Sequence, residues 1–270
     1  MTTFQKIIKY LAIALALFLV VGILEAVLGI VGIVGGLFDG ESSMGESESY
    51  EISAEIDRLE IVVGAVDLRI EQAAAFSVES NLKHLTVKEQ NGTLIIRQKT
   101  NRGITEGEAA LTLYIPAGKV FERVELTTGA GRLTAEQLSA DTLVLELGAG
   151  EVTVNELNAF LSADIAGGTG RITVCDGTLR HLDLEMGVGE LELTSALTGD
   201  CELELGIGRS NVKVLGDRAD YRLDLEKGLG SLTVDGVGIS GTERSGGGEH
   251  KLSIHGGIGA IRLDFVKSAE

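Results

Sequence analysis

The sequence predicts an all-β protein: a right-handed parallel β-helix (solenoid) with coils of about 19–20 residues, preceded by one N-terminal transmembrane helix. Three observations lead to this prediction. A Gly-x-Gly pair recurs seven times, apolar residues alternate on both sides of each pair, and a long apolar run lies near the N-terminus. The second glycines of successive pairs lie 19, 20, 19, 19, 22 and 29 residues apart. The pairs are Gly129/Gly131, Gly148/Gly150, Gly168/Gly170, Gly187/Gly189, Gly206/Gly208, Gly228/Gly230 and Gly257/Gly259.

Each repeat reads as two short strands joined at the glycine pair. Leu143 and Leu145 alternate before one pair, and Val152 and Val154 alternate after it. A period of two residues is typical of strands with one buried face. Glycine suits the corner because it adopts positive φ without a Cβ clash. Units this small must stack to bury their apolar faces, which favours parallel, right-handed coils over an antiparallel sandwich.

Residues 1–38 are expected to form a cytoplasmic start and a transmembrane anchor. Lys6 and Lys9 precede an apolar run from Tyr10 to Phe38, interrupted only by Glu25. About 20 apolar residues are enough to cross a bilayer core, so residues 7–36 are expected to contact lipid. The run is too long for a cleaved signal peptide, and a good cleavage site is missing. The lysines before the run place the N-terminus in the cytoplasm and the β-domain outside the cell.

One face of the apolar run carries small residues and one carboxyl group. Small residues let membrane helices approach closely, and a carboxyl group inside a membrane segment suggests a functional site. We hypothesise a contact with partner membrane proteins through this face. Alternatively, the carboxyl group lies near the outer interface and reaches the lipid headgroups. The residues concerned are Gly22, Glu25, Gly29, Gly32 and Gly36.

The remaining chain divides into four parts. Residues 39–51 are rich in Ser, Glu and Gly and are expected to form an acidic flexible stalk. Residues 52–121 are expected to form irregular opening coils and an N-terminal cap, including a hairpin at Asn91-Gly92 and a strand that ends at Pro116. Residues 122–266 form the solenoid repeats, with a loop insertion at 236–249, and residues 267–270 form a tail.

Composition excludes several classes of function. The net charge of −17 argues against nucleic acid as a partner and against electrostatic docking of the β-domain on anionic lipid. The two cysteines do not make a disulfide framework: Cys201 takes a core strand position and Cys175 an outward one. Ile172 and Ile261 stand where a calcium-binding nonapeptide repeat needs Asp. No catalytic residue and no cofactor is expected. An enzyme that cleaves polysaccharide with surface carboxylates is the alternative.

Stacking the repeats predicts two kinds of charged column. Residues after the second glycine alternate in sign, which predicts a column that fixes the register of the coils. This column comprises Arg132, Glu151, Arg171, Glu190 and Arg209. The strand before each pair instead carries acidic residues at its outward positions, and like charges opposite one another destabilise a sheet. We hypothesise a weak binding face for divalent cations such as Ca²⁺. It comprises Asp183, Glu185, Glu202, Glu204, Asp224 and Glu226. The alternative is a solvated face that prevents aggregation.

Three segments resemble a known family. They are LTLYIPAG at 111–118, VELTTGAGRLTAEQL at 124–138 and LVLELGAGEVTVNEL at 143–157. They are similar to the bacterial "putative adhesin" domain of unknown function, a membrane-anchored family with glycine-rich repeats. The resemblance covers about residues 50–265 and implies a right-handed β-helix at the cell surface. It implies no catalytic residues.

Together, these features predict a non-enzymatic, single-pass membrane protein with an extracellular β-domain. One anchor, a repetitive surface and the lack of a catalytic motif favour an adhesin-like or signalling-accessory interaction module. Other membrane proteins or components of the cell envelope are the expected partners.

Overall fold

The computed structural model describes residues 44–52, 55–98 and 109–267, and these residues form an all-β fold. Their strands join into one 16-stranded sheet. Within these residues the only helix is a single 3₁₀ turn, η1 (Arg218–Asp220), and no helix is long and apolar enough to cross a membrane. The predicted transmembrane anchor and its partner-contact face, residues 1–38, lie outside the described residues.

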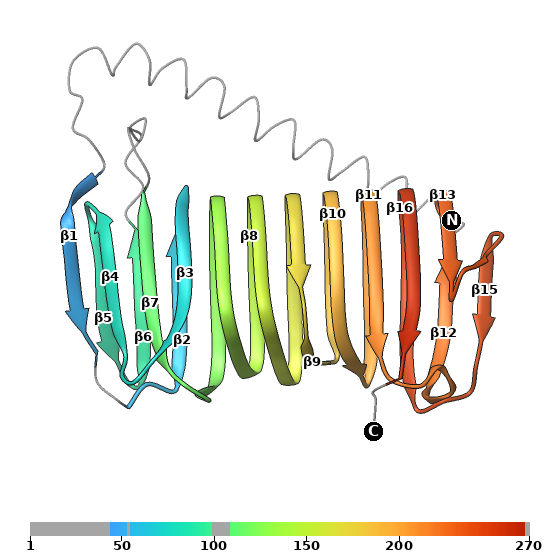
Figure 1. The fold of residues 1–270 in the computed structure, drawn as a ribbon, viewed down its shortest axis with the longest axis horizontal. Helices are drawn as coiled ribbons and strands as arrows, with labels where there is room; N and C mark the ends of the chain where they lie inside the picture. The colour runs from blue at the N-terminus through green and yellow to red at the C-terminus, as the bar shows by residue number, and fades with distance from the viewer. Residues whose placement is uncertain (1–43, 53–54, 99–108, 268–270) are drawn as a thin grey trace, which may run out of the picture. The chain divides into compact units, whose positions relative to one another are not determined.

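Parallel coils fill the middle of the sheet (Figure 1). Strand β8 (Val120–Val174) contains the first three glycine pairs and is followed by β10 (Leu182–Thr198) and β11 (Asp200–Leu215). These strands pair in parallel with glycine opposite glycine: Gly189 lies opposite Gly170 on one side and Gly208 on the other. The prediction of stacked parallel coils is therefore confirmed for this part of the chain.

The core lies inside the coils and consists almost entirely of aliphatic side chains. Leu143, Leu145 and Val154 are buried as the alternation predicts. Besides the strands before and after each glycine pair, each coil has a third, shorter side. On this side β9 (Gly177–Arg180) pairs in parallel with residues 157–159 of β8 and residues 196–198 of β10. Each coil pairs with the coils on either side, so neighbouring coils together enclose one core, as expected for a repeat protein.

The glycine corners are tight because each coil touches the backbone of the coil before it. Gly150 has a φ of +140°, and a Cβ added there would lie 1.9 Å from the carbonyl oxygen of Gly131. At Gly208 the corresponding distance, to the oxygen of Gly189, is 1.7 Å. No side chain fits in such a space, so the second glycine of each pair is required by both conformation and close approach, and the first by close approach.

At the N-terminal end, β2 (Arg58–Val63) and β3 (Val66–Ala73) pair in parallel with β8 and form the first coil. On their outer side lie β6 (Thr93–Gln98) and β7 (Ala110–Pro116). Three antiparallel strands then cover this end: β1 (Met44–Glu51), β4 (Ser77–Leu82) and β5 (Leu85–Gln90). The hairpin at Asn91-Gly92 and the strand ending at Pro116 are confirmed.

Residues 44–51 differ from the flexible stalk that their composition suggests. They form β1, which pairs antiparallel with β4 from Glu48 to Glu51. The polar sequence is extended here because β4 would otherwise leave a row of backbone N–H and C=O groups unpaired. Tertiary pairing thus overrides a local composition that is typical of linkers.

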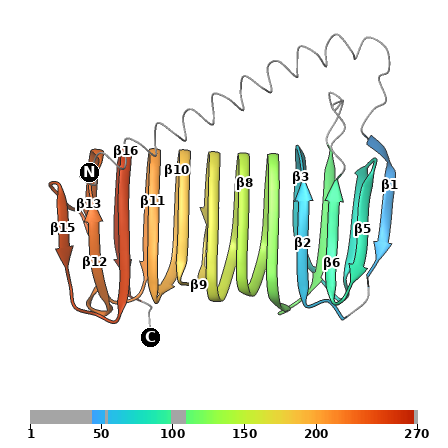
Figure 2. The ribbon, with the colours of Figure 1, turned by 180° about the vertical axis from the view of Figure 1, so that it is seen from behind.

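At the C-terminal end, the coils are not stacked in sequence order, which corrects the simple repeat prediction. The outer coil consists of β12 (Tyr221–Glu226) and β13 (Leu229–Val234), whereas the last strand, β16 (His250–Val266), lies between this coil and β11. Figures 1 and 2 show β16 in this inner position from both sides. The predicted loop at 236–249 contains β14 (Val237–Gly238) and β15 (Thr242–Ser245), which pair antiparallel with the outer coil. These strands cover the exposed edge of the outer coil.

Candidate functional site: charged columns on the coil surface

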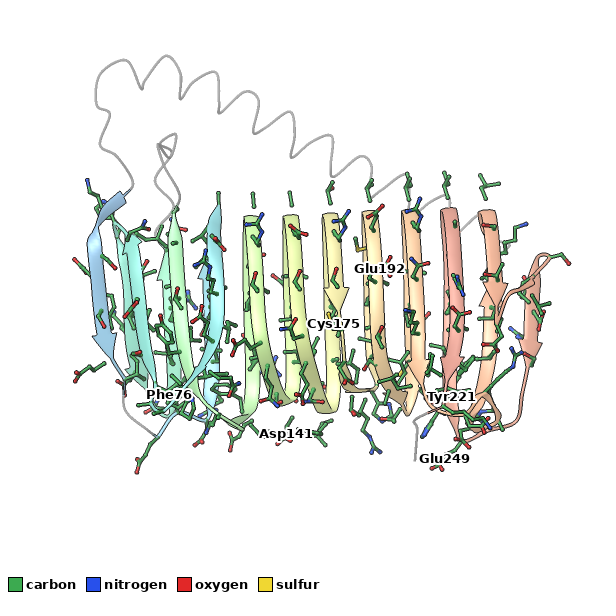
Figure 3. The ribbon with its side chains drawn as sticks, in the orientation of Figure 1. Phe76, Asp141, Cys175, Glu192, Tyr221 and Glu249 are labelled. Atoms are coloured by element: carbon green, nitrogen blue, oxygen red, sulfur yellow. The ribbon has the colours of Figure 1, made fainter. Side chains whose placement is uncertain are left out.

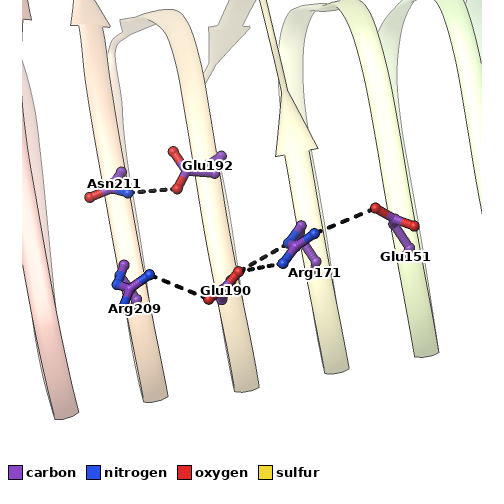
Figure 4. Close-up of polar contacts among 6 residues, drawn as sticks. All are labelled: Glu151, Arg171, Glu190, Glu192, Arg209 and Asn211. Carbon is purple, nitrogen blue, oxygen red and sulfur yellow. Dashed lines mark hydrogen bonds and ion pairs between the residues drawn. The ribbon is translucent and has the colours of Figure 1, made fainter.

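The alternating column lies on one face, as predicted (Figure 4). Glu151 is bracketed by Arg132 at 3.5 Å and Arg171 at 3.7 Å. Glu190 is bracketed by Arg171 at 2.8 Å and Arg209 at 3.5 Å. Each carboxylate thus contacts an arginine in the coil on either side, and a one-coil slip would place like charges together. Two residues further on, Asn211 donates to Glu192 at 2.6 Å.

The acidic column on the preceding strand is not compensated in this way. Asp183 pairs in register with Asp164 on one side and Glu202 on the other, and Glu185 pairs with Glu204. All five side chains are exposed. We call these five residues the acidic face. Its carboxylates therefore stack directly above one another at the spacing of neighbouring strands, about 4.8 Å.

The pKa values of two members reflect this crowding. Partial burial, followed by the negative charges of Asp164 and Glu202, raises the pKa of Asp183 above its ordinary value. Partial burial, followed by Glu204 and the two aspartates, raises the pKa of Glu185. Both effects disfavour the charged form of the carboxyl group. The folded state therefore holds these charges at a cost in stability near neutral pH.

The predicted acidic column is interrupted beyond Glu202 and Glu204, because β16 occupies the next position. Ser253 separates Glu202 from Asp224, and His255 separates Glu204 from Glu226. The His255 ring lies 3.3 Å from Glu202 through Nε2 and 3.4 Å from Glu226 through Nδ1. Asp224 is paired with Arg244 of β15 at 3.2 Å. Asp224 and Glu226 therefore belong to the outer coil and are separate from the acidic face.

The carboxylates form a row and do not surround a common point. In residues 44–52, 55–98 and 109–267, no three His, Cys, Asp or Glu side chains lie close enough together to hold a metal ion. A row of this kind attracts cations through its combined field, and any single ion meets at most neighbouring pairs of carboxylates. The hypothesis is therefore restricted to weak binding of cations along the row, between neighbouring pairs of carboxylates, without a closed coordination site.

The two cysteines occupy the predicted environments. Cys201 is buried and Cys175 is exposed, and both are free thiols. Burial is the main cause that raises the pKa of the Cys201 thiol, so this group stays protonated and packs as a small apolar residue. Neither cysteine adds a reactive group to the acidic face.

Sequence reasoning did not find Ser253 and His255 as neighbours of the acidic residues. The signal was present, because His255 stands four residues before Gly259, just as Glu204 stands four residues before Gly208. The repeat template thus gives the position of His255 within its coil. It does not give the order in which the last two coils stack.

Comparison with known proteins identifies the family and supports the fold. The profile of the Toastrack DUF4097 family matches residues 56–253. No curated protein matches the chain. A crystal structure of a "putative adhesin" from Bacteroides fragilis NCTC 9343 is 14% identical, has a TM-score of 0.50, and covers 83% of this chain and 100% of its own. A "putative lipid binding protein" from Parabacteroides distasonis ATCC 8503 is 15% identical, with a TM-score of 0.39 and coverage of 83% and 99%.

Proposed function

The chain belongs to the Toastrack DUF4097 family, and we propose that it is a non-enzymatic interaction module anchored in the membrane, with its β-domain outside the cell. The acidic face is the surface proposed to make contact. Its partners are hard divalent cations, Ca²⁺ above all, through which it contacts other components of the cell envelope.

One observation carries this proposal: the contrast between two columns on the same coils. The alternating column neutralises each carboxylate with arginines in both neighbouring coils. The acidic face repeats carboxylates at the same spacing, and in the described part of the chain none of its five members forms an ion pair with an arginine or lysine; Glu202 alone lies beside a histidine. Like charges in register destabilise a sheet. A cation bound along the row offsets that cost, so binding and folding are coupled.

Oxygen ligands and exposed positions fit a hard cation that is bound weakly. Ca²⁺ accepts six to eight oxygen ligands, including water, in flexible geometry. Two stacked carboxylates, such as Glu185 and Glu204, supply part of that shell and leave the rest to water or to a second molecule. A shell completed by another anionic molecule would bridge the two, which is how a weak cation face can serve an interaction module.

The test is the thermal unfolding of the full chain in detergent, followed by the β-sheet circular dichroism signal. CaCl₂ should raise the melting temperature more than NaCl of equal ionic strength does, because only the divalent ion bridges stacked carboxylates. The double variant Glu185→Gln/Glu204→Gln should lose this difference between the two salts.

A matched control removes the same charge elsewhere. Glu122→Gln/Glu249→Gln neutralises two exposed carboxylates that lie outside the acidic face, and it should keep the full calcium effect. Equal responses to calcium and sodium in the unmodified chain would overturn the cation assignment. Loss of the calcium effect in the control variant as well would show that net charge is responsible and not the acidic face.

A further inference from the structure

A ridge of exposed apolar side chains runs along the glycine corners of the last four coils. Between the two glycines of each pair stand Val188, Ile207, Ile258 and Leu229, in spatial order. We call these four residues the corner ridge. Their exposed fractions are 46%, 43%, 44% and 68%, and they make up four of the ten exposed large hydrophobic residues in the described part of the chain.

The ridge is continuous and protrudes. Val188 lies opposite Ile207, Ile207 opposite Ile258, and Ile258 opposite Leu229, so the four side chains follow one another at about 4.8 Å over about 14 Å. The flanking glycines have no side chains, so among the described residues no neighbouring side chain on the same corners covers the ridge. Figure 3 shows a row of side chains standing beyond the strand ends at this edge.

The chain enters the described fold at this same edge. Met44, at the start of β1, pairs with Leu82 of β4. Ser80 of β4 pairs with Leu111, and Leu111 pairs with Leu68, two residues after the corner at Val66. The start of β1 is therefore at the corner edge, at the opposite end of the stack from the ridge (Figure 1).

The stretch of chain between the expected membrane span and Met44 is short. Eight peptide steps separate Gly36, the end of the expected span, from Met44, and a fully extended chain covers about 27 Å in eight steps. If residues 7–36 span the bilayer, the corner edge is tethered within that distance of the membrane surface. No other edge of the coils has both the tether and a continuous apolar ridge.

We propose that the corner ridge docks on the phospholipid bilayer, so that the β-domain lies with its corner edge on the membrane. The proposal rests on the membrane anchor of the proposed function. The tether holds one end of the edge and the ridge holds the other end by inserting aliphatic side chains among the headgroups. The alternating column beside the ridge is compatible with zwitterionic lipid because its arginines and glutamates neutralise one another.

The chain contains no tryptophan, so a single introduced tryptophan reports on its own surroundings. Ile207→Trp and Leu229→Trp place the probe on the ridge, and Glu249→Trp places it at an exposed position at the other end of the strands (Figure 3). Each full-length variant is reconstituted into phosphatidylcholine vesicles with and without brominated acyl chains. The ridge probes should shift to shorter wavelength and be quenched by brominated lipid, whereas the Glu249→Trp probe should show neither effect.

Three results would overturn the proposal, and they are distinguishable. A chain that does not float with the vesicles contradicts the anchor, and the proposed function falls with the inference. A chain that floats but has unquenched ridge probes at solvent-like wavelength contradicts the inference alone. Ridge probes that shift to shorter wavelength without quenching by brominated lipid are covered by protein, such as a second copy. Unchanged β-sheet circular dichroism confirms that each variant is folded.

Discussion

At the residue scale, the second glycine of each pair is the least replaceable position in the coil. Gly150→Ala would place Cβ 1.9 Å from the carbonyl oxygen of Gly131 at a φ of +140°. Backbone strain and overpacking together should lower the free energy of unfolding by about 3–5 kcal/mol. Gly236→Ala is the matched control, because its φ is +78° and no atom lies within 4 Å of the added Cβ. It should cost about 1–2 kcal/mol from strain alone. Urea unfolding measures both, and equal losses would contradict the close-approach argument.

A second prediction at this scale concerns Arg171, which contacts Glu151 and Glu190 in the coils on either side. Arg171→Glu would place three carboxylates in register and should lower the melting temperature at low ionic strength. Because these side chains are exposed, 1 M NaCl should remove most of the difference from the unmodified chain. Arg180→Glu makes the same charge change at an exposed position outside the column and serves as control. A salt-independent loss at Arg171 would mean that packing is responsible and not charge.

These residues show which parts of the site can be predicted from the sequence. The alternating column was predictable because sign alternation at a fixed repeat position has one physical interpretation once the coils are stacked. The corner ridge was not predicted, although the residues between the glycines can be seen to grow from Ala130 and Ala149 to Ile207 and Leu229. The alternation pattern predicts which strand residues point into the core and which point to solvent. It makes no prediction for residues at the corner between two strands.

At the element scale, the acidic face makes stability depend on pH. The pKa values of Asp183 and Glu185 are raised above the ordinary values of 3.8 and 4.5. Just above those values, the folded state binds more protons than the unfolded state, so stability falls as pH rises through this window. The melting temperature should therefore rise as pH is lowered from 7 into that window. Below this pH window, protonation of other carboxylates lowers the stability. One of them is Asp217, because hydrogen bonds from the Ala219 N–H and Lys267 lower its pKa in the folded state.

The variant Asp183→Asn/Glu185→Gln tests this assignment. It should melt at a higher temperature than the unmodified chain at pH 7, and its melting temperature should respond less to mild acid, because the crowded charges are gone. Glu122→Gln/Glu249→Gln should leave the pH response unchanged. If the double variant is less stable at pH 7, these carboxylates make favourable contacts and the electrostatic account of the acidic face is wrong.

The coils at the two ends show why element order was harder to predict than element type. Each strand from β2 to β16 that carries the repeat was visible in the alternation and the glycine pairs. The insertion of β16 between β11 and the outer coil has no local signal, because its sequence fits either neighbour equally well. The 29-residue spacing between the last two glycine pairs provides enough residues for β16 to return to the inner position. This length is equally consistent with a surface loop between two coils stacked in sequence order.

At the scale of the whole molecule, both ends of the stack follow the same plan. At each end an outer coil pairs in parallel with an inner coil, and antiparallel strands pair with the free edge of the outer coil. At the N-terminal end β2 and β3 lie inside β6 and β7, and at the C-terminal end β16 lies inside β12 and β13. The open edges of parallel strands are thereby covered by antiparallel pairing, which protects them from joining other chains.

This arrangement predicts an unusual response to truncation. Removing residues 250–270 deletes β16, the only parallel partner of β12 and β13 among the described strands, together with the buried Leu252, Ile254 and Leu263. Residues 221–249 should then unfold although all of them are present. The coils up to β11 should persist, because each coil of a stack depends mainly on its neighbours.

Limited proteolysis with mass spectrometry measures this directly. The truncated chain should yield a resistant fragment that ends near Leu215, the end of β11, with residues 221–249 digested. Removal of residues 268–270 alone should leave the digestion pattern of the full chain, since β16 stays intact. In a solenoid stacked in sequence order, the same truncation would remove only the last coil and leave β12 and β13 protected on β11. Protection of residues 221–234 in the truncated chain would therefore contradict the inserted position of β16.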